Sequence, residues 1–332
     1  MALLNWPDLH GDAFADCRCL VTGGAGFIGS HISRALLELG AEVVVLDDFS
    51  GSDRIAVDAM ARDFAERVRV VESSVLNRGK LDEAAAGCSL VFHEAAAVSV
   101  PESVEDPMRY HEVDATGTLH LLEAARDAGV DRVMFAASAA AYGDDPSLPK
   151  REDMLPLPQS PYAAAKLASE MLLRSHASCY DLDAVSLRYF NVFGPGQNAN
   201  SAYAAVIAAF ARRLRRGEAP TIFGDGEQSR DFVFIDNVVH ANLLAARHPR
   251  PLGGAVFNVA CGDRISVNHL ATQMAAAFDR PDLQPRFAEE RAGDVKHSQA
   301  DIAAIREALG YEPGVGFDDG LRATVAWYAE QR

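Results

Sequence analysis

The chain has 332 residues, 49% of them hydrophobic and 23% charged, which is the composition of a globular protein with one large domain or two moderate ones. Its formal net charge of −16 argues against a surface for nucleic acid or anionic membranes. We find no secretory signal and no apolar run long enough to span a bilayer, so we expect a cytoplasmic protein that binds neither nucleic acid nor membrane.

Strands and helices alternate along the first 190 residues. We expect strands at residues 19–21, 42–46, 68–71, 90–93, 132–136 and 184–188, and helices at 31–39, 55–67, 119–128 and 163–180. This alternation predicts an α/β fold with a doubly wound parallel sheet. We expect an extension without strong periodicity at 1–17 and a dinucleotide-binding domain at 18–190. A smaller α/β substrate domain would lie mainly in 191–332, with some chain exchange and a ligand cleft between the lobes.

A glycine-rich turn joins the first strand to the first helix. Gly23, Gly26 and Gly29 have the spacing G-x-x-G-x-x-G. Glycine permits positive φ and lets backbone amides approach a pyrophosphate, and the helix N-terminus adds donors and a positive dipole end. Asp47 ends the second strand, where a carboxylate can accept both hydroxyls of an adenosine ribose and would repel a 2′-phosphate. The combination predicts a dinucleotide site rather than a glycine turn with only a structural role. It also favours NAD over NADP as the cofactor.

A second informative segment predicts the start of a helix. Ser160 is a typical N-cap residue, and Pro161 follows it at the first helical position. Tyr162 and Lys166 are then one turn apart on the same face. The ammonium and the helix N-terminus both favour a phenolate, so we expect the pKa of Tyr162 to fall from about 10 toward neutrality. The phenol could then serve as a general base. Without the dinucleotide motif upstream, this spacing would be typical of an ordinary helix surface.

Taken together, these motifs resemble the extended group of the short-chain dehydrogenase/reductase superfamily that acts on nucleotide sugars. The resemblance runs from about Arg18 to Trp327 and rests on segments 22–29, 93–97, 138–143, 162–166, 188–195 and 230–236. It implies a Rossmann-like fold that holds NAD. In that family the position of Ser138 hydrogen-bonds the sugar 4-hydroxyl or 4-keto oxygen. Tyr162 moves the proton, and Lys166 holds the nicotinamide ribose and tunes the tyrosine.

The resemblance also implies the binding residues. Cofactor contacts are expected from Gly23, Gly26, Phe27, Ile28, Gly29, Asp47, Asp48, Phe49, Ser50, Gly51, Ser74, Val75, Ala95, Ala96, Ala97, Ala136, Tyr162, Lys166, Tyr189 and Val192. Contacts with a UDP-sugar substrate are expected from Ser99, Ser138, Ala139, Ala140, Tyr162, Asn191, Ala204, Ala205, Val206, Ile222, Phe223, Arg230, Arg291, Asp294 and Ser298. The guanidinium groups of Arg230 and Arg291 would clamp the diphosphate, and Asp294 would meet the uridine ribose.

Three positions depart from the family pattern. Ser74 replaces an acid expected to face the adenine. Asp48 and Asp114 stand where many relatives carry Asn. These departures bear on the affinity for NAD more than on the type of reaction.

The residues between Ser138 and Tyr142 are alanines. Relatives that dehydrate the sugar carry an Asp-Glu pair there, and those that decarboxylate a glucuronate carry Glu, so the remaining chemistry is oxidation at C4 and reduction back. The resemblance is strongest to bacterial UDP-hexose and UDP-N-acetylhexosamine 4-epimerases that serve surface polysaccharides, and segment 291–301 carries that likeness. Tyr at the position of Ser298 is associated with plain hexoses, whereas a small residue leaves room for a 2-acetamido group.

The resemblance therefore implies an NAD-dependent 4-epimerase of UDP-N-acetylglucosamine and UDP-N-acetylgalactosamine. The alternatives are UDP-glucose/UDP-galactose or UDP-N-acetylglucosaminuronate as substrate, or a non-catalytic protein that binds NAD and nucleotide sugars. A homodimer is expected through a four-helix bundle of the helix after Asp106 and the helix containing Tyr162. The five cysteines are scattered, so we expect free thiols and no metal.

Overall fold

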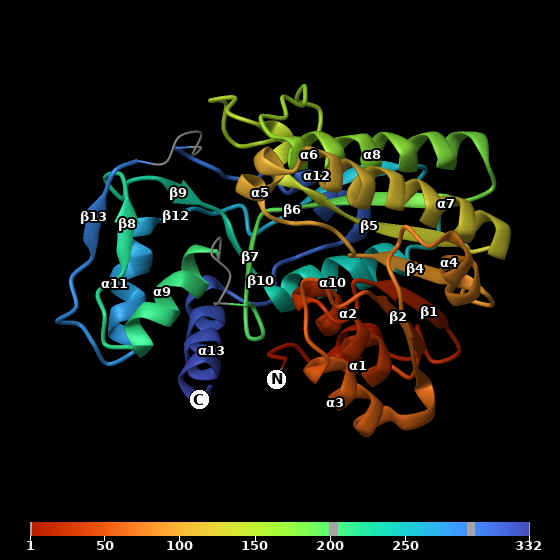
Figure 1. Ribbon diagram of the computed structural model, residues 1–332, viewed down its shortest axis with the longest axis horizontal. Coiled ribbons are helices and arrows are strands. Elements are labelled where there is room, and N and C mark those ends of the chain that lie inside the picture. The colour runs from red at the N-terminus through yellow and green to blue at the C-terminus, as the bar shows by residue number, and fades with distance from the viewer. Residues whose placement is uncertain (1, 199–204, 291–295, 332) are drawn as a thin grey trace.

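The computed structural model describes residues 2–198, 205–290 and 296–331. Its larger lobe is built on a seven-stranded parallel sheet with the strand order β11-β6-β5-β4-β1-β2-β3 (Figure 1). In chain order these strands are β1 (Arg18–Thr22), β2 (Glu42–Asp47), β3 (Val68–Glu72), β4 (Leu90–His93), β5 (Arg132–Ser138), β6 (Asp183–Tyr189) and β11 (Ala255–Val259). The order reverses beside β1, which places a topological switch point at the carboxyl ends of β1 and β4.

Helices cover both faces of the sheet (Figure 1). One face carries α2 (Phe27–Glu38), α3 (Ile55–Phe64), α10 (Ile235–Ala246) and α12 (Ala303–Leu309). The other carries α4 (Arg78–Ala85), α7 (Gly117–Ala128) and α8 (Pro161–Cys179), and the short helices α5 (Val100–Glu105) and α6 (Pro107–Tyr110) pack against α8. A short 3-10 turn (Ala65–Arg67) follows α3, and another (Ala139–Tyr142) follows β5. Both faces are thus buried, as a parallel sheet requires.

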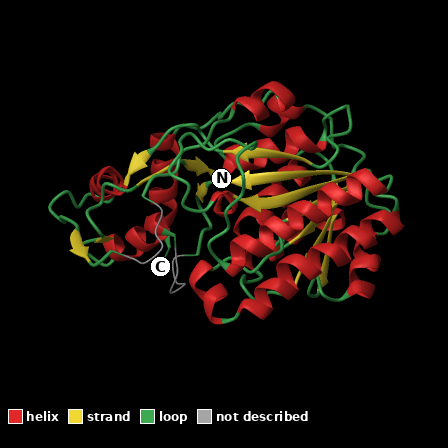
Figure 2. Cartoon of the chain, turned by 90° about the horizontal axis from the view of Figure 1, so that it is seen from above, coloured by secondary structure: helices red, strands yellow, loops and turns green. Residues whose placement is uncertain are grey.

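The smaller lobe extends from one end of the sheet (Figure 2). It contains α9 (Val206–Arg215), α11 (Val267–Ala277) and α13 (Phe317–Glu330), and three pairs of short strands. The pairs are β8 (Thr221–Phe223) with β13 (Arg286–Ala288), β9 (Ser229–Arg230) with β12 (Ile265–Ser266), and β7 (Asn191–Phe193) with β10 (Phe232–Phe234). One hydrophobic core continues from α2 and α10 into α9, α11 and α13.

The predicted fold is confirmed, and all six strands expected from the sequence lie in the sheet. The sequence analysis did not identify the seventh strand, β11, which comes from the second half of the chain and pairs with β6. The N-terminal extension at 1–17 also has structure. It contains α1 (Trp6–His10), whose Trp6 and His10 are buried. The backbone amides of Leu3 and Leu4 donate to the carboxylate of Asp236 on α10.

A buried ion pair fixes α8 against the sheet. Arg188 on β6 donates two hydrogen bonds to the carboxylate of Glu170 on α8, at 2.9 and 2.8 Å. The same guanidinium lies 4.7 Å from the ring centre of Tyr142, whose hydroxyl donates to Asn258 on β11. Since a buried charge is tolerated only with its partner in place, this pair restricts the position of α8 relative to β6.

No helix within the described ranges combines the length and apolar character needed to cross a bilayer.

Candidate functional site

The glycine-rich turn lies at the carboxyl end of β1, where the backbone approaches its neighbours too closely for any side chain. Gly23 has φ +66°, and a Cβ there would lie 2.6 Å from the amide nitrogen of Ala95 in the loop after β4. A Cβ on Gly29 would lie 2.2 Å from the carbonyl oxygen of Gly23. Gly26, the N-cap residue of α2, supplies no side chain to occupy the first amides of the helix. The turn therefore offers an open helix N-terminus to an anion such as a pyrophosphate.

Asp47 organises the neighbouring loop at the end of β2. One oxygen of its carboxylate accepts from the amide of Ala25 at 2.9 Å, and the other accepts from the amide of Phe49 at 2.8 Å and the hydroxyl of Ser52 at 3.1 Å. A carboxylate has about four acceptor positions, so capacity remains for a ligand hydroxyl. Asp48 accepts from the amide and the hydroxyl of Ser50. These contacts fit the adenosine ribose of NAD, with Asp47 already held in position by the glycine turn.

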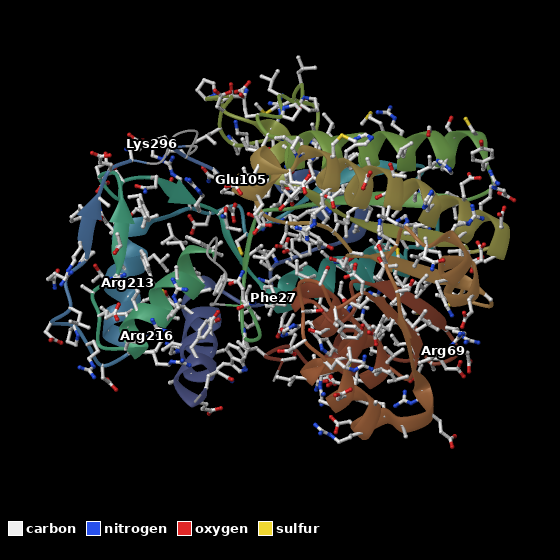
Figure 3. The ribbon with its side chains drawn as sticks, in the orientation of Figure 1. Phe27, Arg69, Glu105, Arg213, Arg216 and Lys296 are labelled. Atoms are coloured by element: carbon white, nitrogen blue, oxygen red, sulfur yellow. The ribbon has the colours of Figure 1, made fainter. Side chains whose placement is uncertain are left out.

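Other expected cofactor residues surround this turn. The side chains of Phe27 and Ile28 begin α2, and Figure 3 shows Phe27 where the two lobes meet. Ala95, Ala96 and Ala97 form the loop after β4, while Ser74 and Val75 follow β3. Val75 is buried against Gly117, where a Cβ would lie 2.6 Å from a Val75 methyl carbon. Gly51 is exposed, Tyr189 ends β6 and Val192 lies in β7.

The three expected catalytic residues meet beside β5. Ser138 ends β5, and its hydroxyl accepts from the amide of Ala140 at 3.1 Å. Tyr162 and Lys166 lie in the first two turns of α8, which Ser160 caps by accepting from the amide of Ala163. The ammonium of Lys166 donates to the carbonyl oxygen of Ala136 at 3.0 Å and lies 4.9 Å from the ring centre of Phe135. Tyr162 forms a side-chain hydrogen bond with Ser138, which offsets part of the rise that burial causes in the pKa of Tyr162.

The expected fall in the pKa of Tyr162 is not found in the protein alone. Burial raises the pKa of this phenol to about 12, the hydrogen bond with Ser138 lowers it, and the negative charge of Asp114 raises it further. Sequence spacing identifies Lys166 as a neighbour but does not reveal how deeply the phenol is buried. Burial thus favours the protonated phenol, and the positive charge on the nicotinamide ring of oxidised NAD would favour the phenolate.

The sequence analysis gave no catalytic role to two carboxyl groups that act on Lys166, namely Glu94 and Asp114, and linked Asp114 only to the affinity for NAD. Glu94 follows β4 and accepts from the hydroxyl of Tyr189 at 3.0 Å, and burial raises the pKa of Glu94 to about 7. Asp114 accepts from the amide of Ala97 at 2.8 Å, and burial raises the pKa of Asp114 to about 6. Burial lowers the pKa of Lys166, whereas both carboxylates raise it. An acid within an otherwise apolar segment after a buried strand was the available sequence signal for Glu94.

Several expected substrate residues come together where β6 leads into the small lobe. Asn191 begins β7, and its amide donates to the carbonyl oxygen of Asp231, next to Arg230. The amide of Ser298 donates to the carbonyl oxygen of Ser229 at 3.0 Å, on the other side of Arg230. The guanidinium of Arg230 donates hydrogen bonds to the carbonyl oxygens of Ser229 and Lys296 (Figure 3). Backbone pairing thus places these three expected residues next to one another.

The remaining expected substrate residues occupy separate elements. Ala139 and Ala140 form the turn after β5, Ser99 caps α5, Ala205 caps α9 where Val206 begins, and Ile222 and Phe223 lie in β8. Ala204, Arg291 and Asp294 lie outside the described residues. A surface pocket of about 250 Å³ involves the opposite ends of the strands, lined among others by Leu90 and Arg132. We do not assign it to the substrate, because ligands of such sheets bind at the carboxyl ends.

Comparisons with known proteins agree with this geometry. The family model described as "NAD dependent epimerase/dehydratase family" matches residues 19–260. A UDP-glucose 4-epimerase of Mycolicibacterium smegmatis is 39% identical over 94% of this chain and 98% of its own length.

Two solved structures extend this agreement to the whole fold. A UDP-N-acetylglucosamine 4-epimerase from Methanobrevibacter ruminantium, in complex with UDP-N-acetylmuramic acid, has a TM-score of 0.89 and 38% identity, covering 94% of this chain and 98% of that one. A UDP-glucose 4-epimerase from Thermotoga maritima, with UDP-glucose, has a TM-score of 0.86 and 37% identity, with the same coverage.

The close approach at the glycine turn leads to a testable prediction. Gly29→Ala places a methyl group 2.2 Å from a backbone oxygen, so the turn must move, at a cost of about 1–3 kcal/mol. We expect the purified variant to retain roughly tenfold less NAD and to unfold at lower urea concentration. Gly79→Ala in α4 is the matched control, since its nearest neighbour is the Asn77 side-chain oxygen at 3.8 Å. Equal NAD retention by Gly29→Ala and its parent would contradict the proposed anion site.

Proposed function

We propose, from the premise that the chain belongs to the NAD-dependent epimerase/dehydratase family, that it interconverts UDP-N-acetylglucosamine and UDP-N-acetylgalactosamine by epimerisation at C4. The observation that carries the reaction type is the meeting of Ser138, Tyr162 and Lys166 at the carboxyl end of β5, with no acid in the 3-10 turn Ala139–Tyr142. Solved relatives that act on UDP-sugars support the substrate class. A small side chain at Ser298 supports the N-acetylated sugar.

In this mechanism NAD would be held at the glycine turn and by Asp47, and when bound it would supply the acceptor and donor of the C4 hydride. Tyr162, as phenolate, takes the proton of the 4-hydroxyl, while Ser138 holds that oxygen by a hydrogen bond. Lys166 remains charged beside the phenol and favours its ionised form. After the 4-keto sugar has turned, Tyr162 returns the proton. Neither elimination of water nor decarboxylation is expected, because the alanines after Ser138 offer no acid or base.

The UDP part of the substrate is proposed to be held by Arg230, Arg291 and Asp294, with Asn191 near the diphosphate. The uracil would be surrounded by Ala204, Ala205, Val206, Ile222 and Phe223. Guanidinium groups suit a diphosphate because they donate paired hydrogen bonds to its oxygens. Holding the substrate by UDP leaves the sugar free to turn between the two transfers, which a single mode of sugar binding would prevent. The backbone anchoring of the Arg230 guanidinium supports a fixed diphosphate position.

A homodimer is also proposed, through the surface of α5 to α8. These helices pack on one another and carry exposed apolar side chains, among them Val104, Met108, Leu119 and Met171. Exposed apolar clusters on soluble proteins often mark interaction sites.

The first prediction of the proposed function concerns turnover. We expect the purified protein to convert UDP-N-acetylglucosamine to UDP-N-acetylgalactosamine without added oxidant or reductant, measured by chromatography of the nucleotide sugars. Tyr162→Phe should lower kcat by about 10²- to 10⁴-fold, as expected for loss of a general acid–base group. If no product forms while NAD is bound, or if Tyr162→Phe matches its parent, the mechanism is wrong.

The second concerns the choice of sugar. Ser298→Tyr should lower kcat/KM for the N-acetylated sugars by roughly a hundredfold, because the phenyl ring would fill the space of the acetamido group, and should retain UDP-glucose. The same panel with UDP-N-acetylglucosaminuronate tests the remaining alternative. Equal losses for acetylated and plain sugars would show that Ser298 does not select between them.

The third concerns assembly. Light scattering should give twice the mass of one chain, and the double variant Leu119→Asp/Met171→Asp should give the mass of a monomer. Leu155→Asp is the control, because Leu155 is 76% exposed in the loop before α8 and not on the proposed interface. A parent protein that is monomeric at micromolar concentration would overturn the proposal.

A further inference from the structure

Asp114 has an unusual setting between α6 and α7. It lies in a π-helical turn, His111–Thr116, and its side chain is buried. One carboxylate oxygen accepts from the amide of Ala97, while the other, Oδ2, is buried and has no hydrogen-bond partner in the described part of the chain. Isolated π-helical turns often occur at functional sites, and an unsatisfied buried carboxylate oxygen is costly. Both features indicate that this oxygen has a role beyond packing.

The surroundings of Asp114 explain that role. The carbonyl oxygen of Asp114 accepts from the hydroxyl of Ser169 on α8 at 2.8 Å. On the same helix, the negative charge of Asp114 raises the pKa values of Tyr162 and Lys166. The ring of Tyr110, just before the π-helical turn, contacts the ring of Tyr162 edge to face at 6.4 Å between centroids.

The other charged or titratable groups around the cluster come from four elements. Arg109 on α6 acts on Asp114, while Glu94 after β4 and Glu170 on α8 act on Lys166. Arg188 on β6 pairs with Glu170. His93 on β4 is connected to the Asp114 backbone through the Thr118 hydroxyl, which donates its proton to the Asp114 carbonyl oxygen and accepts from Nε2 of His93. Burial and the charge of Lys166 lower the pKa of His93 to about 3, so this imidazole is neutral. Lys166, one helical turn after Tyr162 on α8, is the cation that remains beside the phenol.

We propose that Asp114 is a positioning residue for the Tyr162–Lys166 pair: the negative charge of its carboxylate, one oxygen of which has no hydrogen-bond partner in the described part of the chain, keeps the Lys166 ammonium charged and opposes the loss of the Tyr162 proton. An Asn at this position could accept from Ala97 in the same way but would carry no charge. The charge of Asp114 therefore influences the pH at which the phenol of Tyr162 becomes a base. The effect of this charge on turnover rests on the proposed function.

The sign of the effect follows from electrostatics. Removing a negative charge near a phenol stabilises the phenolate, so its pKa falls, and it also makes the nearby ammonium easier to deprotonate. Burial raises the pKa of Asp114 to about 6, so its influence is present above about pH 6 and fades as the carboxyl is protonated. The acid and alkaline limbs of the pH–rate profile should both move to lower pH when the charge is removed.

The test is Asp114→Asn, which keeps the volume and the acceptor for Ala97. The NAD-bound protein, without sugar, is titrated by the ultraviolet difference absorbance of phenolate, with Tyr162→Phe as the background for the other tyrosines. We expect the midpoint of Tyr162 to fall by about 1 pH unit, which is tenfold more phenolate at a fixed pH. Glu112→Gln, an exposed carboxyl in the same π-helical turn, should leave the midpoint unchanged.

Asp114→Ala separates charge from anchoring, because it removes both the charge and the acceptor for Ala97. If the Asn and Ala variants both lower the midpoint, the inference holds. If only the Ala variant changes it, or neither does, Asp114 is an anchor for the loop after β4 and the inference is overturned. The titration needs no sugar, so failure of epimerisation with a lowered midpoint would overturn the proposed function alone. Epimerisation with an unchanged midpoint would overturn this inference alone.

Discussion

The cofactor edge of the sheet depends on a close contact between three backbone segments, the ends of β1 and β4 and the start of α2, with no side chain between them. The turn at Gly23 lies against the backbone of Ala95, and the first helical turn at Gly29 lies against Gly23 itself, at separations that leave no room for a Cβ. This contact brings the ends of β1 and β4 and the start of α2 to one point. Asp47 then closes the edge from the side of β2 by accepting from the amide of Ala25. The dinucleotide edge is therefore defined by backbone geometry, to which only glycine conforms.

The chemistry beside this edge depends on buried charges. Lys166 shares the interior with three carboxylates, one of which, Glu170, is already paired with Arg188. Burial alone would favour the neutral amine, and the carboxylates oppose that tendency. The same arrangement keeps the phenol of Tyr162 protonated in the protein alone. Under the proposed function, a positively charged cofactor ring in this site would favour the phenolate of Tyr162, and would so couple binding of the cofactor to activation of the base.

The six strands could be predicted from the sequence because each is a short apolar run with a stop signal nearby. The motifs of Ser138, Tyr162 and Lys166 are also local, and the structure brings these three residues together, while their catalytic role stays a prediction. The elements that the sequence analysis missed depend on contacts between residues far apart in the chain. The segment Ala255–Val259 has the composition of a strand, but its pairing with β6 depends on the path of α10 across the sheet. The sequence Trp6–His10 is too short to show a helical period, yet it forms α1 because Trp6 and His10 are buried against the rest of the protein. Likewise, spacing locates Lys166 next to Tyr162 but cannot supply the burial that decides the pKa of the phenol.

The segment that contains Ser298 shows how the chain could tune the choice of sugar without altering the fold. The amide of Ser298 pairs with Ser229, that of Ala300 donates to the buried carboxylate of Asp231, and the carbonyl oxygen of Gln299 accepts from the amide of Lys150. Three consecutive residues are thus joined to both lobes by main-chain contacts that do not involve their side chains. A substitution at Ser298 changes the volume presented at that point while the path of the backbone remains fixed. Under the proposed function, the choice of sugar can therefore vary at this position independently of Tyr162 and Lys166 on α8. The placement of α8 depends on the separate contact between Arg188 and Glu170.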